Sequence, residues 1–237
     1  MSVDSPDLAS KAAVKLRDEL IARLAHDART PLGAILTWLE LLKSQVDDPH
    51  ARRSVEAAQQ SARDLVEIVS AVEDAQRLAA GTLELQLSPV DLAALVAFAA
   101  DRARSSGEGR GIVQDRDLGL AGISVLGDLA RLRHAFGRVL FHCTSLSGKG
   151  TMRLVLRAEA PQARVVITCP ALALSVPLQQ ALNGHDEWPS IVGPNGQAAL
   201  DFAVSCRVLR LHGGRLEAAA LPDDAGTELV ATLPLAK

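Results

Sequence analysis

The amino-terminal part of the chain constrains the fold most, because it contains two long stretches of helical periodicity separated by one turn signal. Residues 8–46 contain a single proline, Pro31, and the sequence Asp47-Asp48-Pro49 then marks a turn. Residues 50–80 repeat apolar side chains at helical spacing, and Gly81 follows them as a helix-ending glycine would. The pattern therefore predicts two long helices joined by a tight turn.

These two helices define the first expected domain, a helical hairpin over residues 1–81. A lone hairpin leaves the apolar stripes of its helices half covered. Pairing with a second copy completes a four-helix bundle, so we expect a homodimer.

After Gly81 the pattern changes to short helices mixed with strands, which is typical of an α+β fold. We expect a linker at 82–89, containing a strand at 82–87, and a second domain at 90–237. That domain is predicted to be an α/β sandwich, a mixed sheet with helices on one face. Its helices are expected at 91–105, 128–143 and 198–212, and its main strands at 152–158, 164–169, 215–220 and 227–233.

Composition excludes several classes of function. The 25 basic and 28 acidic side chains give a formal net charge of −3, which argues against a nucleic-acid partner. Three widely separated cysteines form no zinc or disulfide pattern and suit a reducing compartment. The amino end lacks a signal-peptide pattern, and the longest apolar run, Leu92 to Ala100, is too short to span a bilayer. A cytoplasmic protein without a membrane partner or an intrinsic metal is expected.

The segment Ile21–Leu42 places one histidine on a polar helix face. At about 100° per residue, Leu24, Ile35 and Leu42 lie about 160° to 180° around the helix from His26. Thr30, Gly33 and Thr37 instead lie close to His26. A bulky partner can therefore approach this imidazole.

The residue types around His26 suit phosphoryl chemistry. A neutral imidazole is a nucleophile at physiological pH. The adjacent Asp27 is expected to accept a hydrogen bond from one ring nitrogen, which leaves the other free to attack phosphorus. Thr30, one helical turn on, is expected to position a water molecule or a phosphoryl oxygen. Pro31 removes the amide that would bond to the carbonyl of Asp27, so the helix can bend there.

The string His26-Asp27-Ala28-Arg29-Thr30-Pro31-Leu32 resembles the H-box of sensor histidine kinases, whose pattern is His-Glu/Asp-x-Arg-Thr-Pro-Leu. The resemblance includes the dimerising hairpin and the junction GTLELQLSPVDL that follows it. It implies that His26, Asp27 and Thr30 form the catalytic set. The residues expected to dock a partner around it are Arg23, Arg29, Gly33 and Thr37.

The second domain resembles the Bergerat-type ATPase domain of the same kinases. Leu211–Leu216 (LHGGRL) is similar to the LHGGxI element of that domain, and Thr227–Pro234 is similar to its last strand. The nucleotide positions depart from the family pattern. Arg138 and His142 stand where the family has Asn, the second of which coordinates Mg²⁺, and His is a poor ligand for this cation.

Two further nucleotide elements also differ. Ala171, Ala173 and Ser175 replace an Asp-x-Gly-x-Gly sequence that reads adenine and lets the backbone approach it. Asp201 stands in the phosphate loop before the last helix, where its charge would repel phosphates. These departures lead us to expect no bound ATP.

The function expected from these features is a histidine phosphotransferase that shuttles phosphoryl groups between receiver-domain aspartates through His26, without ATP. Its partners would be response-regulator receiver domains, which supply Mg²⁺ from their own acidic pockets, and an upstream kinase or hybrid kinase. Two alternatives remain open. One is an ATP-dependent histidine kinase with a divergent nucleotide pocket, and the other is a non-catalytic module that binds receivers.

Overall fold

The structure of the chain is a computed structural model. It describes residues 5–105, 112–117, 122–146, 150–170, 172–184 and 196–236. The contacts within the chain divide it into two compact units, Met1–Leu83 and Glu84–Lys237. The predicted helical hairpin is thus one unit, and the predicted α/β domain belongs to the other.

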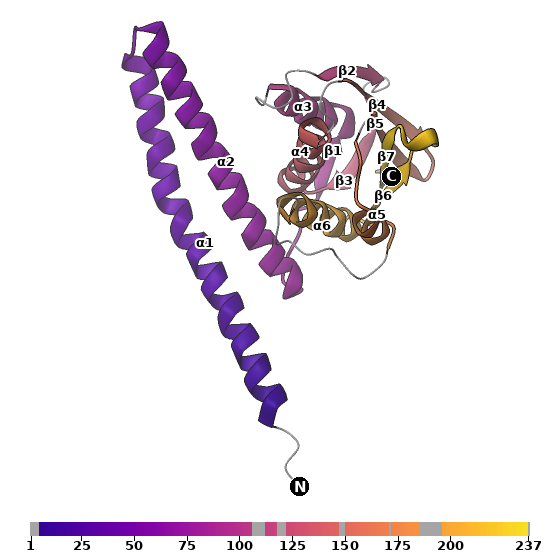
Figure 1. Cartoon of the computed structure of the whole chain (residues 1–237), viewed down its shortest axis with the longest axis horizontal. Helices are drawn as coiled ribbons and strands as arrows, with labels where there is room; N and C mark the ends of the chain where they lie inside the picture. The colour runs from indigo at the N-terminus through magenta and orange to yellow at the C-terminus, as the bar shows by residue number, and fades with distance from the viewer. Residues whose placement is uncertain are drawn as a thin grey trace. The chain divides into compact units, whose positions relative to one another are not determined.

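Unit 1 is the expected hairpin of two antiparallel helices, α1 (Ser5–Gln45) and α2 (Pro49–Ala79), which lie side by side in Figure 1. Its turn lies where the sequence predicts it, at residues 46–48. The carboxylate of Asp48 caps α2 by accepting the amide of Ala51 at 2.9 Å, and Pro49 occupies the first helical turn. At the other end, Gly81 adopts a φ of 66° and the Thr82 amide donates to the Arg77 carbonyl, which closes the helix.

Polar pairs across the hairpin fix the register of the two helices. The Gln59 amide nitrogen donates to Glu40 at 2.6 Å, although Gln59 is almost fully buried, and Lys43 lies 3.1 Å from Glu56. A buried amide without a partner is costly, so a shift of register by one turn would be unfavourable. The hairpin therefore has one preferred alignment.

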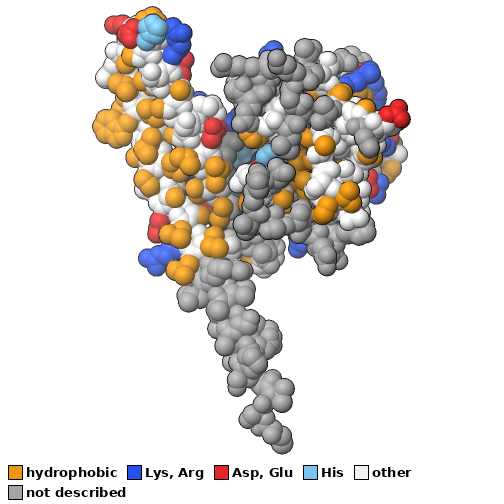
Figure 2. Space-filling view, viewed as in Figure 1, with side chains coloured by type: hydrophobic (Ala, Val, Ile, Leu, Met, Phe, Trp, Pro, Cys, Tyr) orange, Lys and Arg blue, Asp and Glu red, His pale blue; other side chains and the backbone are white. Residues whose placement is uncertain are grey.

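The apolar stripe that the sequence marks on α1 does not face α2. The side chains buried against α2 include Ala25 and Leu32, which lie to one side of that stripe. Leu24 is 68% exposed and Trp38 is 70% exposed, and Figure 2 shows hydrophobic side chains along the visible face of the hairpin. The large apolar side chains left exposed on unit 1 are Leu20, Leu24, Ile35, Trp38, Leu41, Leu42, Leu65 and Ile68. The hairpin thus has a second apolar surface, which its own helices leave uncovered.

Unit 2 contains two sheets and four α-helices among its described residues. Strands β1 (Ser88–Asp91) and β3 (Ser124–Gly127) form an antiparallel pair. The larger sheet has the order β2-β4-β5-β7-β6, in which only β2 and β4 are parallel. Its strands are β2 (Ile112–Asp117), β4 (Gly150–Glu159), β5 (Gln162–Pro170), β6 (Arg215–Ala220) and β7 (Gly226–Pro234). The helices are α3 (Leu92–Ser105), α4 (Leu129–Leu146), α5 (Val176–Leu182) and α6 (Gly196–Leu211), and a 3₁₀ turn, η2, spans Pro222–Asp224.

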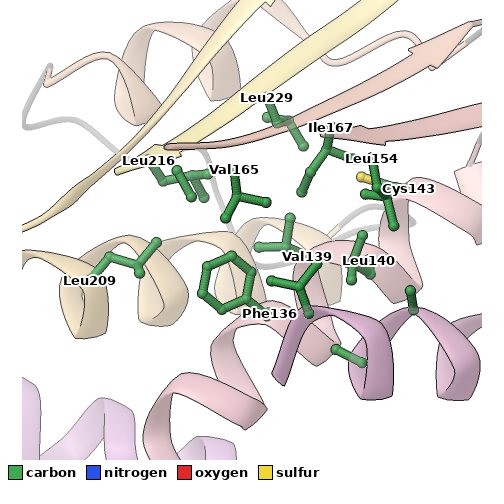
Figure 3. Packing of buried hydrophobic residues seen from close by; sticks show 14 of the residues in the cluster. Phe136, Val139, Leu140, Cys143, Leu154, Val165, Ile167, Leu209, Leu216 and Leu229 are labelled. Atoms are coloured by element: carbon green, nitrogen blue, oxygen red, sulfur yellow. The ribbon is translucent and has the colours of Figure 1, made fainter. Parts of the chain in front are cut away.

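Helices α3, α4 and α6 cover one face of the larger sheet (Figure 1), so the predicted α+β sandwich is confirmed. The alternation along β5 explains why only one face is covered, because Ala163, Val165, Ile167 and Cys169 are buried and the residues between them are half-buried. In the close-up, Phe136 and Val139 of α4 point toward this face of the sheet (Figure 3).

The predicted strand at 82–87 is wrong. Its alternating sequence has no strand beside it, and the chain there is irregular until β1 begins at Ser88. A strand needs a partner for its backbone groups, and β3 pairs with Ser88–Asp91 alone. The sequence patterns predicted neither β3 nor α5, both of which are very short.

His212 of the predicted LHGG element is a structural residue. Its Nε2 accepts the backbone amide of Asp128 at 3.0 Å, so its Nδ1 has the proton and donates to the Val208 carbonyl at 2.7 Å. The carboxylate of Asp128 in turn accepts the amides of Arg131 at 3.1 Å and Gln86 at 3.1 Å. One buried imidazole thus joins α6 to the start of α4 and to the segment before β1.

The glycines of the LHGG element provide a stability test. A Cβ on Gly214 would lie 2.0 Å from the backbone oxygen of Thr232, which cannot move without breaking the β6–β7 pairing. We expect Gly214→Ala to destabilise the chain by about 3 kcal/mol or more. Gly137→Ala is the control, because a Cβ there meets nothing within 4 Å in the middle of α4. It should stabilise by about 0.5–1 kcal/mol. Urea unfolding measures both, and equal effects would contradict the packing described here.

Candidate active site

His26 lies on an exposed part of α1, five residues before Pro31, which the helix contains without a break. Within the described residues, no hydrogen bond or ion pair engages its ring. Both ring nitrogens are therefore available to solvent or to a partner. The structure places the predicted nucleophile as the helical arithmetic requires, away from Leu24 and Leu42 on the exposed apolar face.

The neighbours of His26 are also exposed, and several bond within their own helix. Asp27 lies 3.8 Å from Arg23, its partner one turn earlier, and the Thr37 hydroxyl donates to the Gly33 carbonyl at 3.0 Å. Thr30 is exposed, and a Cβ on Gly33 would meet nothing within 4 Å. The Asp27 carboxylate lies beside Arg23, one helical turn away. It does not face the His26 ring, because adjacent residues on a helix do not face each other. The surface around His26 is polar and open.

Arg29 has a contact that the sequence did not predict. Its Nη2 lies 2.7 Å from Glu73 and donates to the Ser70 hydroxyl at 3.1 Å, so it connects the turn after His26 to α2. The Glu73 side chain is only 11% exposed and needs this counter-charge. Polar residues on the inner side of α2, including the buried Ser70 and Asp74, are the sequence signal for such an interhelical pair.

In unit 2, three of the singled-out residues form one cluster between α4 and α6. His142 Nε2 lies 2.9 Å from Asp201 Oδ2, and Arg138 Nε lies 3.6 Å from Asp201 Oδ1. All three are buried, with exposed fractions of 9% for Arg138, 6% for His142 and 7% for Asp201. Arg138 and His142 are one helical turn apart on α4, which aims both at the same carboxylate.

The surroundings of this cluster are apolar. The Phe141 ring meets the His142 ring edge-on at 5.3 Å, and the Phe202 ring lies 5.8 Å from it. A carboxylate in such a place needs a cation to remain charged. The expectation that Asp201 repels phosphates is therefore wrong in its mechanism, because its charge is buried and neutralised by Arg138.

The cluster does not fit a Mg²⁺ ion. Mg²⁺ prefers six oxygen ligands in octahedral geometry. Asp201 is the only acidic side chain of the cluster, and its two oxygens already face the nitrogens of Arg138 and His142. The described residues contain no group of three His, Cys, Asp or Glu that could hold a metal. Of the expected adenine-site positions, Ala173 and Ser175 are exposed, while Ala171 lies outside the described residues.

Comparison with known proteins identifies the architecture. Residues 16–81 match the His Kinase A (phospho-acceptor) domain family. The matched residues include His26 and the whole H-box. The chain is built as a sensor histidine kinase core. In this kinase core the phospho-acceptor hairpin precedes a domain with the histidine kinase ATPase fold.

Curated relatives align with nearly the whole kinase core. The alginate biosynthesis sensor protein KinB of Pseudomonas aeruginosa is 23% identical over 95% of this chain and 38% of its own length. The sensor histidine kinase GacS of Pseudomonas protegens is 27% identical over 98% of this chain and 26% of its own length. The chain thus spans well under half the length of these relatives.

Solved structures show the same fold. Full-length ShkA, in complex with AMPPNP, has a TM-score of 0.64 and 24% identity, covering 92% of this chain and 46% of ShkA. The histidine kinase AdeS of Acinetobacter baumannii has a TM-score of 0.53 and 16% identity, covering 90% of this chain and 98% of that structure.

These findings overturn the expectation of an ATP-independent phosphotransferase. The relatives that align over both units include the sensor histidine kinase GacS, so the ATP-dependent alternative is the better interpretation. The expectation failed because it treated each departing position as a lost contact, although Asp201 is paired inside the fold. In the described ranges, none of the helices combines the length and hydropathy that a membrane span requires.

The buried cluster generates a stability prediction. Asp201→Asn keeps the size of the side chain but leaves the Arg138 cation buried without its counter-charge. We expect a loss of about 3–5 kcal/mol in the free energy of unfolding. Glu159→Gln is the control, because Glu159 pairs with Arg164 on the surface at 4.0 Å. It should cost less than about 1 kcal/mol. Comparable losses in urea unfolding of the two variants would refute the buried ion pair.

Proposed function

We propose that this chain is the catalytic core of an ATP-dependent, two-component histidine kinase, with His26 as the residue that becomes phosphorylated. The observation that supports this most directly is the exposed, unbonded ring of His26 within a phospho-acceptor domain. The complex of full-length ShkA with AMPPNP, an ATP analogue, supports ATP as the phosphoryl source, since ShkA aligns over 92% of this chain.

In the proposed reaction, a neutral ring nitrogen of His26 attacks the γ-phosphorus of ATP. A nitrogen–phosphorus bond forms, the bond between this phosphorus and the β–γ bridging oxygen breaks, and ADP leaves with that oxygen. The ring proton is released as the phosphohistidine returns to its neutral form. The open surface around His26 suits this step, since it leaves room for a nucleotide-bearing domain to approach.

The neighbours of His26 have separate proposed roles. Asp27, released from Arg23 when a partner docks, would orient the imidazole, and Thr30 would hold a phosphoryl oxygen or a water molecule. Arg23, Gly33 and Thr37 would form the docking surface. Arg29 would contribute through its link to α2, because its guanidinium already binds Glu73 and Ser70.

The proposed acceptor of the phosphoryl group is the aspartate of a response-regulator receiver domain. Transfer breaks the nitrogen–phosphorus bond and forms a bond from phosphorus to a carboxylate oxygen, and the freed ring nitrogen takes up a proton from water, which regenerates neutral His26. Receiver domains would bring Mg²⁺ in their own acidic pockets, so this second step requires no metal ligand from the hairpin.

Replacing the nucleophile tests the proposal. His26→Gln should abolish incorporation of label from γ-phosphate-labelled ATP, because no other proposed group accepts phosphoryl. His50→Gln is the matched control, since His50 is also an exposed histidine, at the start of α2. It should leave labelling unchanged. Acid-labile, base-stable label quantified on both variants and on the parent chain provides the measurement.

Two outcomes would contradict this assignment. Full labelling of the His26→Gln variant would show that another residue accepts the phosphoryl group. Absence of label from the parent chain, even with receiver and Mg²⁺ present, would refute the ATP-dependent activity. Circular dichroism of each variant verifies that the hairpin is still helical.

We also propose that two copies of the hairpin pair through the exposed apolar surface of unit 1. Leu24 and Trp38 lie on one side of α1, and Leu65 and Ile68 are exposed on α2. Contiguous exposed apolar surface of this kind marks an interaction site. Two hairpins would complete a four-helix bundle and bury these side chains.

Charges placed on this surface should separate the copies. The double variant Leu24→Glu/Trp38→Glu would bury charges in the bundle, so we expect it to be monomeric. The parent chain should have about twice its mass of 25.0 kDa in sedimentation equilibrium. Leu126→Glu in β3, another exposed apolar position, is the control and should remain dimeric. A monomeric parent chain would refute the dimer.

A further inference from the structure

The Arg138–His142–Asp201 cluster is an unusual feature for the interior of a small domain. One permanent cation, one imidazole and one carboxylate meet where α4 packs on α6, and all are at least nine-tenths buried. Asp201 Oδ2 bonds to His142, while Asp201 Oδ1 has no hydrogen-bond partner within the described residues. The unbonded oxygen faces Arg138 at 3.6 Å, so its stabilisation is electrostatic.

In this arrangement the Asp201 carboxylate has the Arg138 cation beside it. In many sites the cation beside a buried carboxylate is a metal ion, which binds the oxygen directly. Here the guanidinium supplies the positive charge from within the chain, and the imidazole occupies the second oxygen. A divalent cation entering the same space would meet the Arg138 charge and would find Asp201 as its only acidic ligand in the cluster.

We propose that Arg138 is a built-in substitute for a divalent cation at the α4–α6 interface, so that this cluster coordinates no Mg²⁺. One consequence rests on the proposed kinase function: the affinity of the chain for ATP does not depend on Mg²⁺. Nucleotide binding then relies on protein groups alone, and the charge that neutralises Asp201 is present whether or not nucleotide is bound.

Calorimetry on the whole chain tests the consequence for nucleotide. ATP is titrated once with excess Mg²⁺ and once with excess EDTA at matched ionic strength. Dissociation constants that agree within about threefold support the inference. An absence of binding in both conditions would overturn this consequence for nucleotide together with the ATP-dependent part of the proposed function, and the cation site itself is then decided by the Arg138 variant below. Tightening by Mg²⁺ of about tenfold or more overturns the inference.

A charge-reversal variant tests the role of Arg138 directly. Arg138→Glu would place a second carboxylate beside Asp201 and His142, which gives a divalent cation three ligands and removes the internal cation. We expect millimolar Mn²⁺ to raise the melting temperature of this variant by about 3 °C or more over matched NaCl, and to leave that of the parent chain unchanged. Arg138→Gln serves in the same way if the first variant does not fold.

The outcomes of the second experiment are decisive in both directions. Stabilisation of the variant alone supports the substitution of a metal by Arg138. A similar rise for the parent chain would show that the interface already binds a divalent cation. A folded variant that Mn²⁺ does not stabilise would show that removing Arg138 does not create a cation site. Either result overturns the inference.

Discussion

A hairpin of two helices can bury only one side of each helix, and this geometric limit determines most of what unit 1 does. The side of α1 that includes Ala25 and Leu32 is used against α2. Leu24 and Trp38 remain outside, which creates a surface for a second copy, and His26 faces away from both. A nucleophile placed on the third side of a helix stays exposed when the other two sides are covered. The same limit thus produces the proposed dimer surface and the open acceptor site.

In each unit, a carboxylate that is shielded from water pairs with a cation on a neighbouring helix. In unit 1, the mostly buried Glu73 is neutralised by Arg29, which joins the acceptor turn of α1 to α2. In unit 2, Asp201 is neutralised by Arg138 and bonded by His142 between α4 and α6. A carboxylate shielded from water selects its partner strongly, because leaving it unpaired costs several kcal/mol, about 3–5 in typical buried pairs. Each pair therefore fixes how two helices meet.

The corrected function shows the limit of judging a site by residue type. Read along the sequence, His142 is a lost metal ligand and Asp201 is a charge that repels phosphate. In the structure the two residues bond to each other, and the charge of Asp201 is neutralised within the fold. Counting the positions at which a chain departs from its family does not measure the loss in binding or stability, because substituted residues that contact each other can compensate one another. The relatives point to a kinase, and the cluster indicates how such a kinase would differ in its use of metal.

The sequence by itself determined the hairpin, the face of α1 that presents His26, the α+β class and the H-box, because helical periodicity and turn chemistry act over a few residues. The positive φ of Gly81 agrees with its predicted place at the end of the second helix. Tertiary structure decided which apolar stripe of α1 faces α2, why β1 begins at Ser88 rather than in the alternating segment before it, and that Arg138, His142 and Asp201 meet. These outcomes depend on partners dozens of residues away, and a local pattern contains no information about which distant group a buried side chain will meet.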